Sequence, residues 1–275
     1  MADQISKAVA FAELHRSGTF IVPNPWDAGS ARVLSGHGFL GLATTSAGFA
    51  FSLGRADCAG LVTRGEALTN ARSIVEATHL PVTADLESGY GDSPGDVAET
   101  IRQAAEVGLV GASIEDAAGE TGGEIRDIAE AVDRVVAAVE AARAQPFPFT
   151  LTARADNFFQ GRFDLDDTIR RLQAFAEAGA DVLYAPALPS LDAVRAVCSS
   201  LDKPVNVLAA GPVLACSVAD LGALGVRRVS LGSALPRAAL TAVLDAAAEL
   251  VGSGTFGFAK SALGHAEANA LLGRS

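Results

Sequence analysis

The chain has 275 residues, of which 49% are hydrophobic, and a formal net charge of −11 at neutral pH. Such a chain can bury one large core, and its acidic excess argues against nucleic acid or an anionic membrane surface as partner, though not against a small acidic substrate. We find no signal-peptide pattern at the amino terminus, and no apolar run approaches the roughly 18 residues of a membrane span. Three cysteines without metal-ligand spacing predict reduced thiols in a cytoplasmic protein.

Short apolar segments recur along the chain, and most are continuously apolar, which is typical of strands buried on both faces of a parallel sheet. We expect strands at 19–24, 39–45, 80–86, 109–116, 148–156, 180–187, 203–210 and 226–233. Helical patterns lie between them, for example at 93–108, 164–179, 190–202 and 235–252. These units predict a single α/β domain over residues 1–275, a (β/α)₈ TIM-type barrel at about 19–250 with a C-terminal helical tail at 251–275. An open doubly wound sheet is the alternative, but we find no G-x-G-x-x-G motif after an early strand.

Acidic residues follow two neighbouring predicted strands. Asp85 and Glu87 end the third strand and Glu115 ends the fourth, so their carboxylates should converge at the catalytic rim of the barrel. Because like charges at close range disfavour ionisation, a divalent cation would relieve the conflict. Ligands that are all oxygen favour Mg²⁺, or Mn²⁺, over zinc. The alternative is that these acids are helix caps or rim salt bridges.

A single arginine, Arg154, ends the fifth predicted strand, and its planar fork suits a substrate carboxylate. The alternative is an internal salt bridge to Glu115 or Asp156. No histidine falls at a predicted strand end, and Lys203 falls at the opposite rim, which argues against zinc-dependent and Schiff-base enzymes. The remaining chemistry is a carboxylate-held Mg²⁺ with an arginine, suited to binding a 2-oxo acid and stabilising its enolate.

Five segments occur in order along the chain: "PNPWDAGSARVL", "TTSAGFAFSLGRAD", "ADLESGYGD", "ASIEDAAGETGGEI" and "LTARADNF". Together they resemble the isocitrate lyase/phosphoenolpyruvate mutase superfamily, from about Ile21 to Leu235. The resemblance implies an α/β barrel that binds Mg²⁺ and a small 2-oxo acid or related dicarboxylate. It also implies a homo-oligomer, commonly a tetramer, in which C-terminal helices are exchanged between subunits.

The resemblance also implies roles for individual residues. Asp85 matches the direct metal ligand, and Glu87 stands where the family usually has a second aspartate. Glu115 and Asp57 match acids that act on metal-bound water. The residues that match the substrate contacts are Ser46, Ala47 and Gly48, which cradle a carboxylate, then Arg154 and, more weakly, Trp26 and Asn206.

The segment after the fourth predicted strand departs from the family pattern. It reads "AAGETGGE", without the Cys, His and Lys of the isocitrate-type lyases or the Lys and Asn of the phosphonate enzymes. Decarboxylation asks less of this segment, in which Glu120 is expected to be a proton relay or substrate filter, or else an exposed loop acid. The sequence therefore predicts an Mg²⁺-dependent carbon–carbon lyase for a small 2-oxo or 2-hydroxy dicarboxylate, with oxaloacetate decarboxylation as the specific reaction. The alternatives are an isocitrate- or methylisocitrate-type lyase of low activity, a phosphonopyruvate mutase or hydrolase, and a non-catalytic protein that binds a 2-oxo acid such as 2-oxoglutarate.

Overall fold

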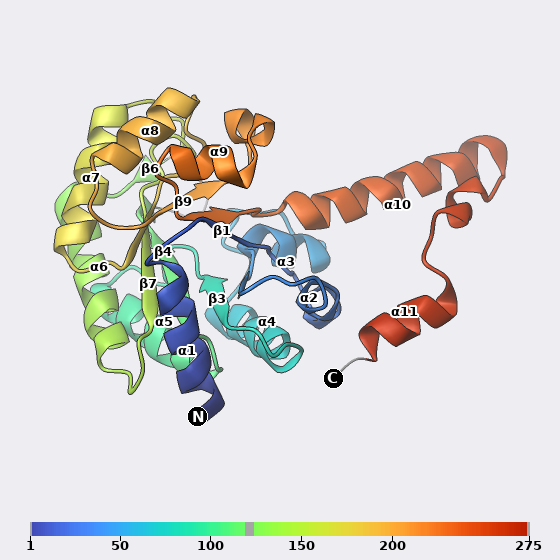
Figure 1. The fold of residues 1–275 in the computed structure, drawn as a ribbon, viewed down its shortest axis with the longest axis horizontal. Helices are drawn as coiled ribbons and strands as arrows, with labels where there is room; N and C mark the ends of the chain where they lie inside the picture. Colours follow the sequence, from blue (N-terminus) through green and yellow to red (C-terminus); the bar gives the residue numbers. More distant parts are fainter. Residues whose placement is uncertain (1, 119–123, 274–275) are drawn as a thin grey trace.

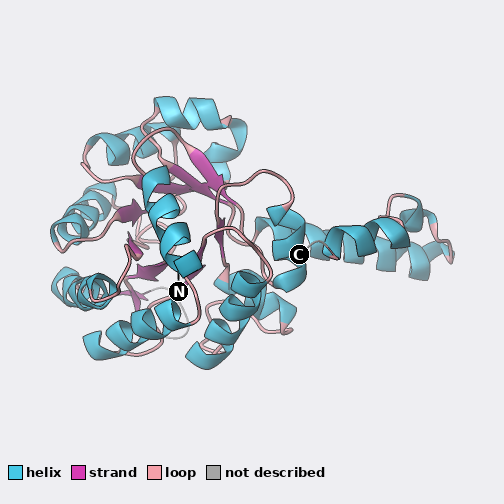
Figure 2. Ribbon diagram, turned by 60° about the horizontal axis from the view of Figure 1, so that its bottom comes forward, coloured by secondary structure: helices cyan, strands magenta, loops and turns pink. Residues whose placement is uncertain are grey.

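Parallel strands form a barrel with helices around its outside (Figures 1 and 2) in the computed structural model, which describes residues 2–118 and 124–273. The barrel strands are β1 (Phe20–Val22), β2 (Leu42–Ala43), β3 (Val82–Asp85), β4 (Gly111–Glu115), β7 (Thr150–Arg154), β8 (Val182–Tyr184), β9 (Val205–Leu208) and β10 (Arg228–Ser230). Their order around the sheet is β1-β10-β9-β8-β7-β4-β3-β2. Each strand lies within a range expected from the sequence, and the predicted TIM-type barrel is confirmed.

The barrel closes between β1 and β2, the two ends of this strand order. The backbone N–H of Ala43 donates to the carbonyl of Pro23 over 3.0 Å. Just beyond β1, the buried Asn24 side chain accepts from the backbone N–H groups of Leu231 (2.7 Å) and Gly232 (3.1 Å), and its Nδ2 donates to the carbonyl of Thr44 (2.8 Å). One amide therefore holds the carboxyl ends of β1, β2 and β10 together.

The outer helices begin and end where local side-chain chemistry favours it. Ser93 caps the helix α5 (Pro94–Glu106) by accepting from the backbone N–H of Asp96 over 3.2 Å, and Pro94 occupies the first turn. Gly108 follows this helix with a φ of 98°, a left-handed conformation that favours glycine. The other outer helices are α2 (Ala28–Ser35), α4 (Arg64–Glu76), α6 (Ile128–Arg143), α7 (Leu165–Glu177), α8 (Leu191–Ser199) and α9 (Val218–Ala223).

The amino-terminal helix α1 (Ala2–Leu14) covers the amino ends of the strands. The Gln4 side chain donates to the carbonyls of Ala105 (2.8 Å), in the last turn of α5, and of Leu109 (3.0 Å), just before β4. Phe11 is buried with Val22 of β1 in a small core cluster. Because α1 covers this end, the polar cavity of the barrel lies toward the carboxyl ends of the strands.

Several short elements and the C-terminal helices complete the fold. They are α3 (Ser46–Ser52), the antiparallel pair β5 (Ala117–Ala118) and β6 (Glu124–Ile125), η1 (Gly211–Ala215), α10 (Ala234–Ser253), η2 (Gly257–Lys260) and α11 (His265–Leu272). Helix α10 leaves the barrel as an arm, and α11 turns back toward α2, where Arg32 donates to the carbonyl of Leu272 over 3.3 Å (Figure 1). Among the described residues, every helix is too short or too polar to cross a bilayer.

Candidate active site

A cavity of about 700 Å³ opens at the carboxyl-terminal ends of the barrel strands. The loops and strand ends around it are where a parallel barrel gathers its reactive groups. Its lining includes the following residues singled out from the sequence: Ser46, Ala47, Asp57, Asp85, Glu87, Glu115, Arg154 and Asn206.

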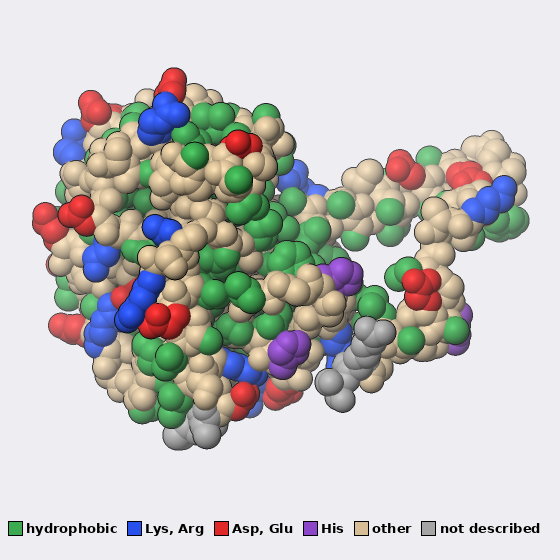
Figure 3. Space-filling view, viewed as in Figure 1, with side chains coloured by type: hydrophobic (Ala, Val, Ile, Leu, Met, Phe, Trp, Pro, Cys, Tyr) green, Lys and Arg blue, Asp and Glu red, His purple; other side chains and the backbone are tan. Residues whose placement is uncertain are grey.

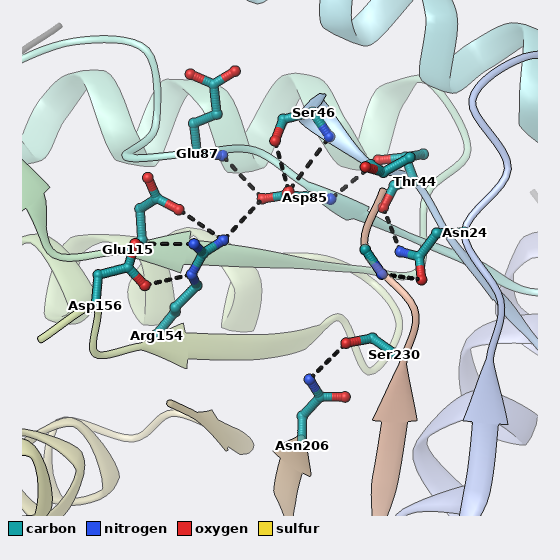
Figure 4. A network of polar contacts seen from close by, with 12 residues as sticks. Asn24, Thr44, Ser46, Asp85, Glu87, Glu115, Arg154, Asp156, Asn206 and Ser230 are labelled. Carbon is teal, nitrogen blue, oxygen red and sulfur yellow. Dashed lines mark hydrogen bonds and ion pairs between the residues drawn. The ribbon is translucent and has the colours of Figure 1, made fainter. Parts of the chain in front are cut away.

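Arg154 lies at the centre of the acidic group (Figure 4). Its Nη1 is 2.9 Å from Oε2 of Glu115 and 3.9 Å from Oδ1 of Asp85, while Nε and Nη2 donate to the two carboxylate oxygens of Asp156 over 2.5 and 2.9 Å. Burial opposes the charged form, but Asp156 and Glu115 hold the pKa of Arg154 well above its usual range. The guanidinium also lies over the rings of Phe159 (5.2 Å) and Tyr184 (5.5 Å). Arg154 therefore lines the cavity and also forms the internal salt bridges, to Glu115 and Asp156, that the sequence offered as the alternative.

Asp85 is fixed by donors from the neighbouring strand end. Its Oδ2 accepts from the Ser46 hydroxyl over 2.8 Å, and its own backbone N–H donates to the Thr44 hydroxyl over 3.1 Å. The Glu87 N–H points at Oδ1 from 3.4 Å. These contacts hold the carboxylate at the end of β3, facing Arg154.

Burial and the charges of neighbouring acids raise the pKa values of the remaining acids of the cavity. Burial, and then the charges of Asp85 and Asp57, raise the pKa of Glu87 to about 7. Burial and the charge of Asp85 likewise raise the pKa of Asp57. The pKa of Glu115 is raised well above its usual range, chiefly by burial, which outweighs the attraction of Arg154. The site therefore holds more acid than its own arginine neutralises, and a cation there would offset the excess.

The acids of the cavity are better suited to hold Mg²⁺ with its waters than to hold a metal whose ligands are all protein side chains. The acids present oxygen only, and within the described ranges no three His, Cys, Asp or Glu side chains group closely enough to enclose an ion. Mg²⁺ characteristically keeps several waters and takes one or two carboxylates directly. Asp85 can be such a direct ligand, with Asp57, Glu87 and Glu115 reached through water.

Backbone strain gathers around the cavity. Among the described residues, four other than glycine have a left-handed φ, and three of these line the cavity: Cys58 (55°), Glu87 (50°) and Tyr90 (55°). Such conformations cost about 1–3 kcal/mol each and concentrate at functional sites. In the turn after β3 the strained backbone directs Glu87 toward Tyr90, whose hydroxyl lies 3.4 Å from its carboxylate.

Arg134 of α6 supports that turn from behind. This buried guanidinium donates to the carbonyls of Ser88, Gly91 (2.9 Å) and Asp92 (2.5 Å). Three backbone acceptors are thus tied to one rigid side chain, which fixes the path of the chain beyond Glu87.

Two of the residues carried over by resemblance lie outside the cavity lining. Gly48 is buried in the first turn of α3, where its N–H donates to the Thr45 hydroxyl over 3.1 Å, so Thr45 caps the helix at this N–H. A Cβ on Gly48 would lie 2.6 Å from Cγ2 of Thr45, and Trp26 lies on the same side, with its Cβ 3.2 Å from that position. Both residues therefore pack α3 against its surroundings. Glu120 lies outside the described residues.

The sequence reasoning missed Arg228, the first residue of β10. It is 4% exposed, lines the cavity, and donates through Nε to Oδ1 of Asn206 over 2.9 Å. The sequence does indicate its orientation: Arg228 lies two positions before Ser230 in an apolar strand. Side chains two positions apart in a strand lie on the same face of the sheet.

Comparisons with known proteins identify the family of this chain. The family model described as phosphoenolpyruvate phosphomutase matches residues 11–251. The uncharacterised protein Rv1998c of Mycobacterium tuberculosis is 34% identical over 241 residues, 87% of this chain and 88% of its own. An oxaloacetate decarboxylase of Chromohalobacter salexigens is 30% identical over 240 residues, 85% of this chain and 81% of its own.

A solved structure has nearly the same fold as this chain. A proposed lyase/mutase from Burkholderia cenocepacia J2315 has a TM-score of 0.94 and 52% identity, covering 98% of this chain and 96% of its own. Its likeness extends over the arm as well as the barrel, since only about a fiftieth of this chain lies outside the match. From the family match and these relatives, the chain belongs to the phosphoenolpyruvate mutase/isocitrate lyase superfamily, whose members are carbon–carbon lyases and mutases of small oxo acids.

Proposed function

We propose that this protein cleaves a carbon–carbon bond in a small 2-oxo or 2-hydroxy dicarboxylate with the help of Mg²⁺, and that oxaloacetate decarboxylation is its specific reaction. The observation that carries the proposal is the group formed by Arg154, Asp85 and Glu115 at the strand ends, beside a cavity large enough for such a substrate. Relatives named as oxaloacetate decarboxylases support the specific reaction, at 30% and 31% identity over 85% and 74% of this chain.

In this proposal Asp85 holds Mg²⁺ directly, and Asp57, Glu87 and Glu115 hold it through water; Mn²⁺ is the substitute of similar chemistry. When bound, the ion would polarise the 2-oxo group and offset the charge of the enolate. Arg154 donates to the substrate carboxylate, helped by the backbone of Ser46 and Ala47 at the start of α3.

The reaction itself requires little from the protein beyond binding and charge. Breaking the bond between C3 and C4 of oxaloacetate releases CO₂ and leaves the electron pair on C3 as an enolate. A proton then adds to C3 and gives pyruvate. We keep Glu120 as the proposed proton relay of this second step, and Asn206 as a substrate contact on the far side of the cavity.

We further propose that the protein is a cytoplasmic homo-oligomer, a dimer or a tetramer. The arm formed by α10 and α11 carries hydrophobic side chains in the open (Figure 3), among them Leu244 (68% exposed) and Val251 (90% exposed). A second copy of the chain would cover them. The three cysteines are free thiols, in keeping with a reducing compartment.

A turnover screen with Mg²⁺ tests the reaction. The panel holds oxaloacetate, isocitrate, 2-methylisocitrate, 2,3-dimethylmalate and phosphonopyruvate, with coupled detection of pyruvate, glyoxylate or succinate. The proposal predicts pyruvate from oxaloacetate well above the protein-free rate. Cleavage of a 2-hydroxy acid alone would move the assignment to that substrate, and Mg²⁺-dependent binding without any product would move it to a 2-oxo-acid binding protein.

A further inference from the structure

Arg228 brings a positive charge into the inner part of the cavity, where its partners are all neutral. Its Nε donates to Oδ1 of Asn206 (2.9 Å), its Nη2 to the Thr152 hydroxyl (2.9 Å), and its Nη1 faces Nε2 of His15 (3.3 Å). No described carboxylate lies within ion-pair distance of this guanidinium. Arg154, in contrast, is neutralised by the chain's own acids.

The groups beside Arg228 leave it cationic at neutral pH. Burial lowers the pKa of Arg228 to about 10, still far above neutrality. Burial, followed by the charge of Arg228, lowers the pKa of His15 to about 3, so this imidazole is neutral and accepts at Nε2. A buried charge without a counter-charge is costly, and an anion entering the cavity would offset that cost.

Arg228 also fixes how Asn206 faces the cavity. Since Oδ1 of this amide accepts from Arg228, its Nδ2 is turned the other way and lies 3.0 Å from the Ser230 hydroxyl. Asn206 is 1% exposed and lines the cavity together with Ser230. Figure 4 shows these two side chains apart from the group around Arg154. The cavity thus has two ends, which we call poles. The acidic pole is formed by Asp85 of β3, Glu115 of β4 and Arg154 of β7, and the donor pole by Asn206 of β9 with Arg228 and Ser230 of β10.

We propose that Arg228 is a positioning residue that makes the protein selective for dicarboxylates: it orients the Asn206 amide and supplies the positive charge that binds the second carboxylate of the substrate. This inference rests on the proposed function, in which the first carboxylate and the 2-oxo group lie at the acidic pole. A ligand with a methyl group in place of the second carboxylate leaves the charge of Arg228 without a counter-ion and binds more weakly.

Two ligands with the same carbon skeleton are each compared between wild type and variant, so that the change in the ratio of their affinities reports the interaction with the second carboxylate. They are 3,3-difluorooxaloacetate, an inhibitor of the related oxaloacetate acetylhydrolase, and 2-oxobutanoate, which carries a methyl group where the second carboxylate would be. Calorimetry on the full chain with saturating Mg²⁺ gives both dissociation constants without requiring turnover. In Arg228→Met we expect the dicarboxylate to bind about 10- to 100-fold more weakly and 2-oxobutanoate to bind within about twofold of wild type.

Two further variants separate the charge from the packing. Thr152→Val removes one hydrogen bond of Arg228 but keeps its charge, so the preference for the dicarboxylate should remain. Asn206→Asp is nearly isosteric and gives Arg228 a carboxylate of the chain's own, so the preference for the dicarboxylate should disappear. This test does not depend on whether Arg228→Met folds.

Equal weakening of both ligands in Arg228→Met would overturn the inference, because it would indicate a purely structural role. An unchanged preference in Asn206→Asp would overturn it as well. If either of these two results is found while the wild type turns over oxaloacetate, the proposed function stands and only the inference fails. If the wild type binds neither ligand in the presence of Mg²⁺, both fail together.

Discussion

The buried arginine of the acidic group is expected to be essential for both stability and activity. The side chains of Arg154, Glu115 and Asp156 are 11%, 14% and 0% exposed, so removing the cation leaves two acids buried without its positive charge. In Arg154→Met we expect the free energy of unfolding at pH 7 to fall by about 3–5 kcal/mol, and kcat/KM for oxaloacetate to fall by at least about 100-fold. Urea denaturation and a coupled pyruvate assay measure the two effects.

The matched control removes an arginine from an exposed ion pair. Arg195 of α8 lies 3.6 Å from Asp192, and both side chains are well exposed. Arg195→Met should therefore change the unfolding free energy by less than about 1 kcal/mol. Similar losses in the two variants would contradict the burial argument.

His15 is expected to make the protein less stable as the pH falls. Its folded-state pKa of about 3 lies below its ordinary value of 6.5, so unfolding takes up a proton at pH values between the two. The contribution to stability is complete above about pH 6.5 and is lost progressively toward pH 3. Lowering the pH from about 7.5 to about 5.5 should therefore reduce the free energy of unfolding by about 1.4 kcal/mol through this group.

Urea denaturation at several pH values tests this, with His15→Gln as the comparison. The glutamine can still donate toward the Phe11 carbonyl, which accepts from Nδ1 of His15 over 2.9 Å, but it does not titrate. The stability of the variant should decline less between these pH values. Equal slopes for the two proteins would show that His15 is not the titrating group.

At the level of secondary-structure elements, close packing at the start of α3 restricts Gly48 to glycine. A Cβ there would lie 2.6 Å from Cγ2 of Thr45 and 2.8 Å from Cγ of Pro236, closer than packed atoms can approach. Gly48→Ala should therefore destabilise the protein by about 1–3 kcal/mol. Gly65→Ala in the first turn of α4 is the control, since its Cβ would meet no atom within 4 Å.

The control variant should be neutral or more stable by about 0.5–1 kcal/mol, because alanine favours helices more than glycine does. Thermal unfolding of both variants measures the difference. If Gly48→Ala were as stable as Gly65→Ala, α3 would have to be free to shift away from α10.

The barrel strands were predictable because burial on both faces demands continuously apolar segments, and each barrel strand lies inside its expected range. The short pair β5 and β6 lies outside the expected ranges. The gathering of Asp85, Glu115 and Arg154 was predictable because parallel strands end at one rim. The hydrogen bond from the Gly48 N–H to Thr45 was not predictable. A strand end made of small residues and the first turn of a helix have the same composition. Arg228 was missed because it begins its strand, away from the rim where a parallel barrel is expected to hold reactive groups, although alternation places it on the same face as Ser230.

For the whole molecule, the arm should determine the oligomeric state. Leu244 lies on α10, outside the cavity lining, and its exposure would be costly in an isolated chain. We expect Leu244→Glu to shift the protein from an oligomer toward the monomer in sedimentation-velocity experiments. Leu40→Glu places the same charge on another exposed leucine, just before β2, and should leave the assembly unchanged. A wild-type protein that sediments as a monomer at micromolar concentration would contradict the proposed oligomer.

The measurement that tests the central claim most directly is the Mg²⁺ dependence of oxaloacetate decarboxylation by the wild type and by Asp85→Asn. Pyruvate release is followed with and without Mg²⁺, and the protein-free rate is subtracted because the ion alone promotes this reaction. We predict turnover that requires Mg²⁺ in the wild type and falls by at least about 100-fold in Asp85→Asn, with an unchanged circular dichroism spectrum. Full activity in that variant, or equal wild-type activity after removal of the metal by a chelator, would contradict the account.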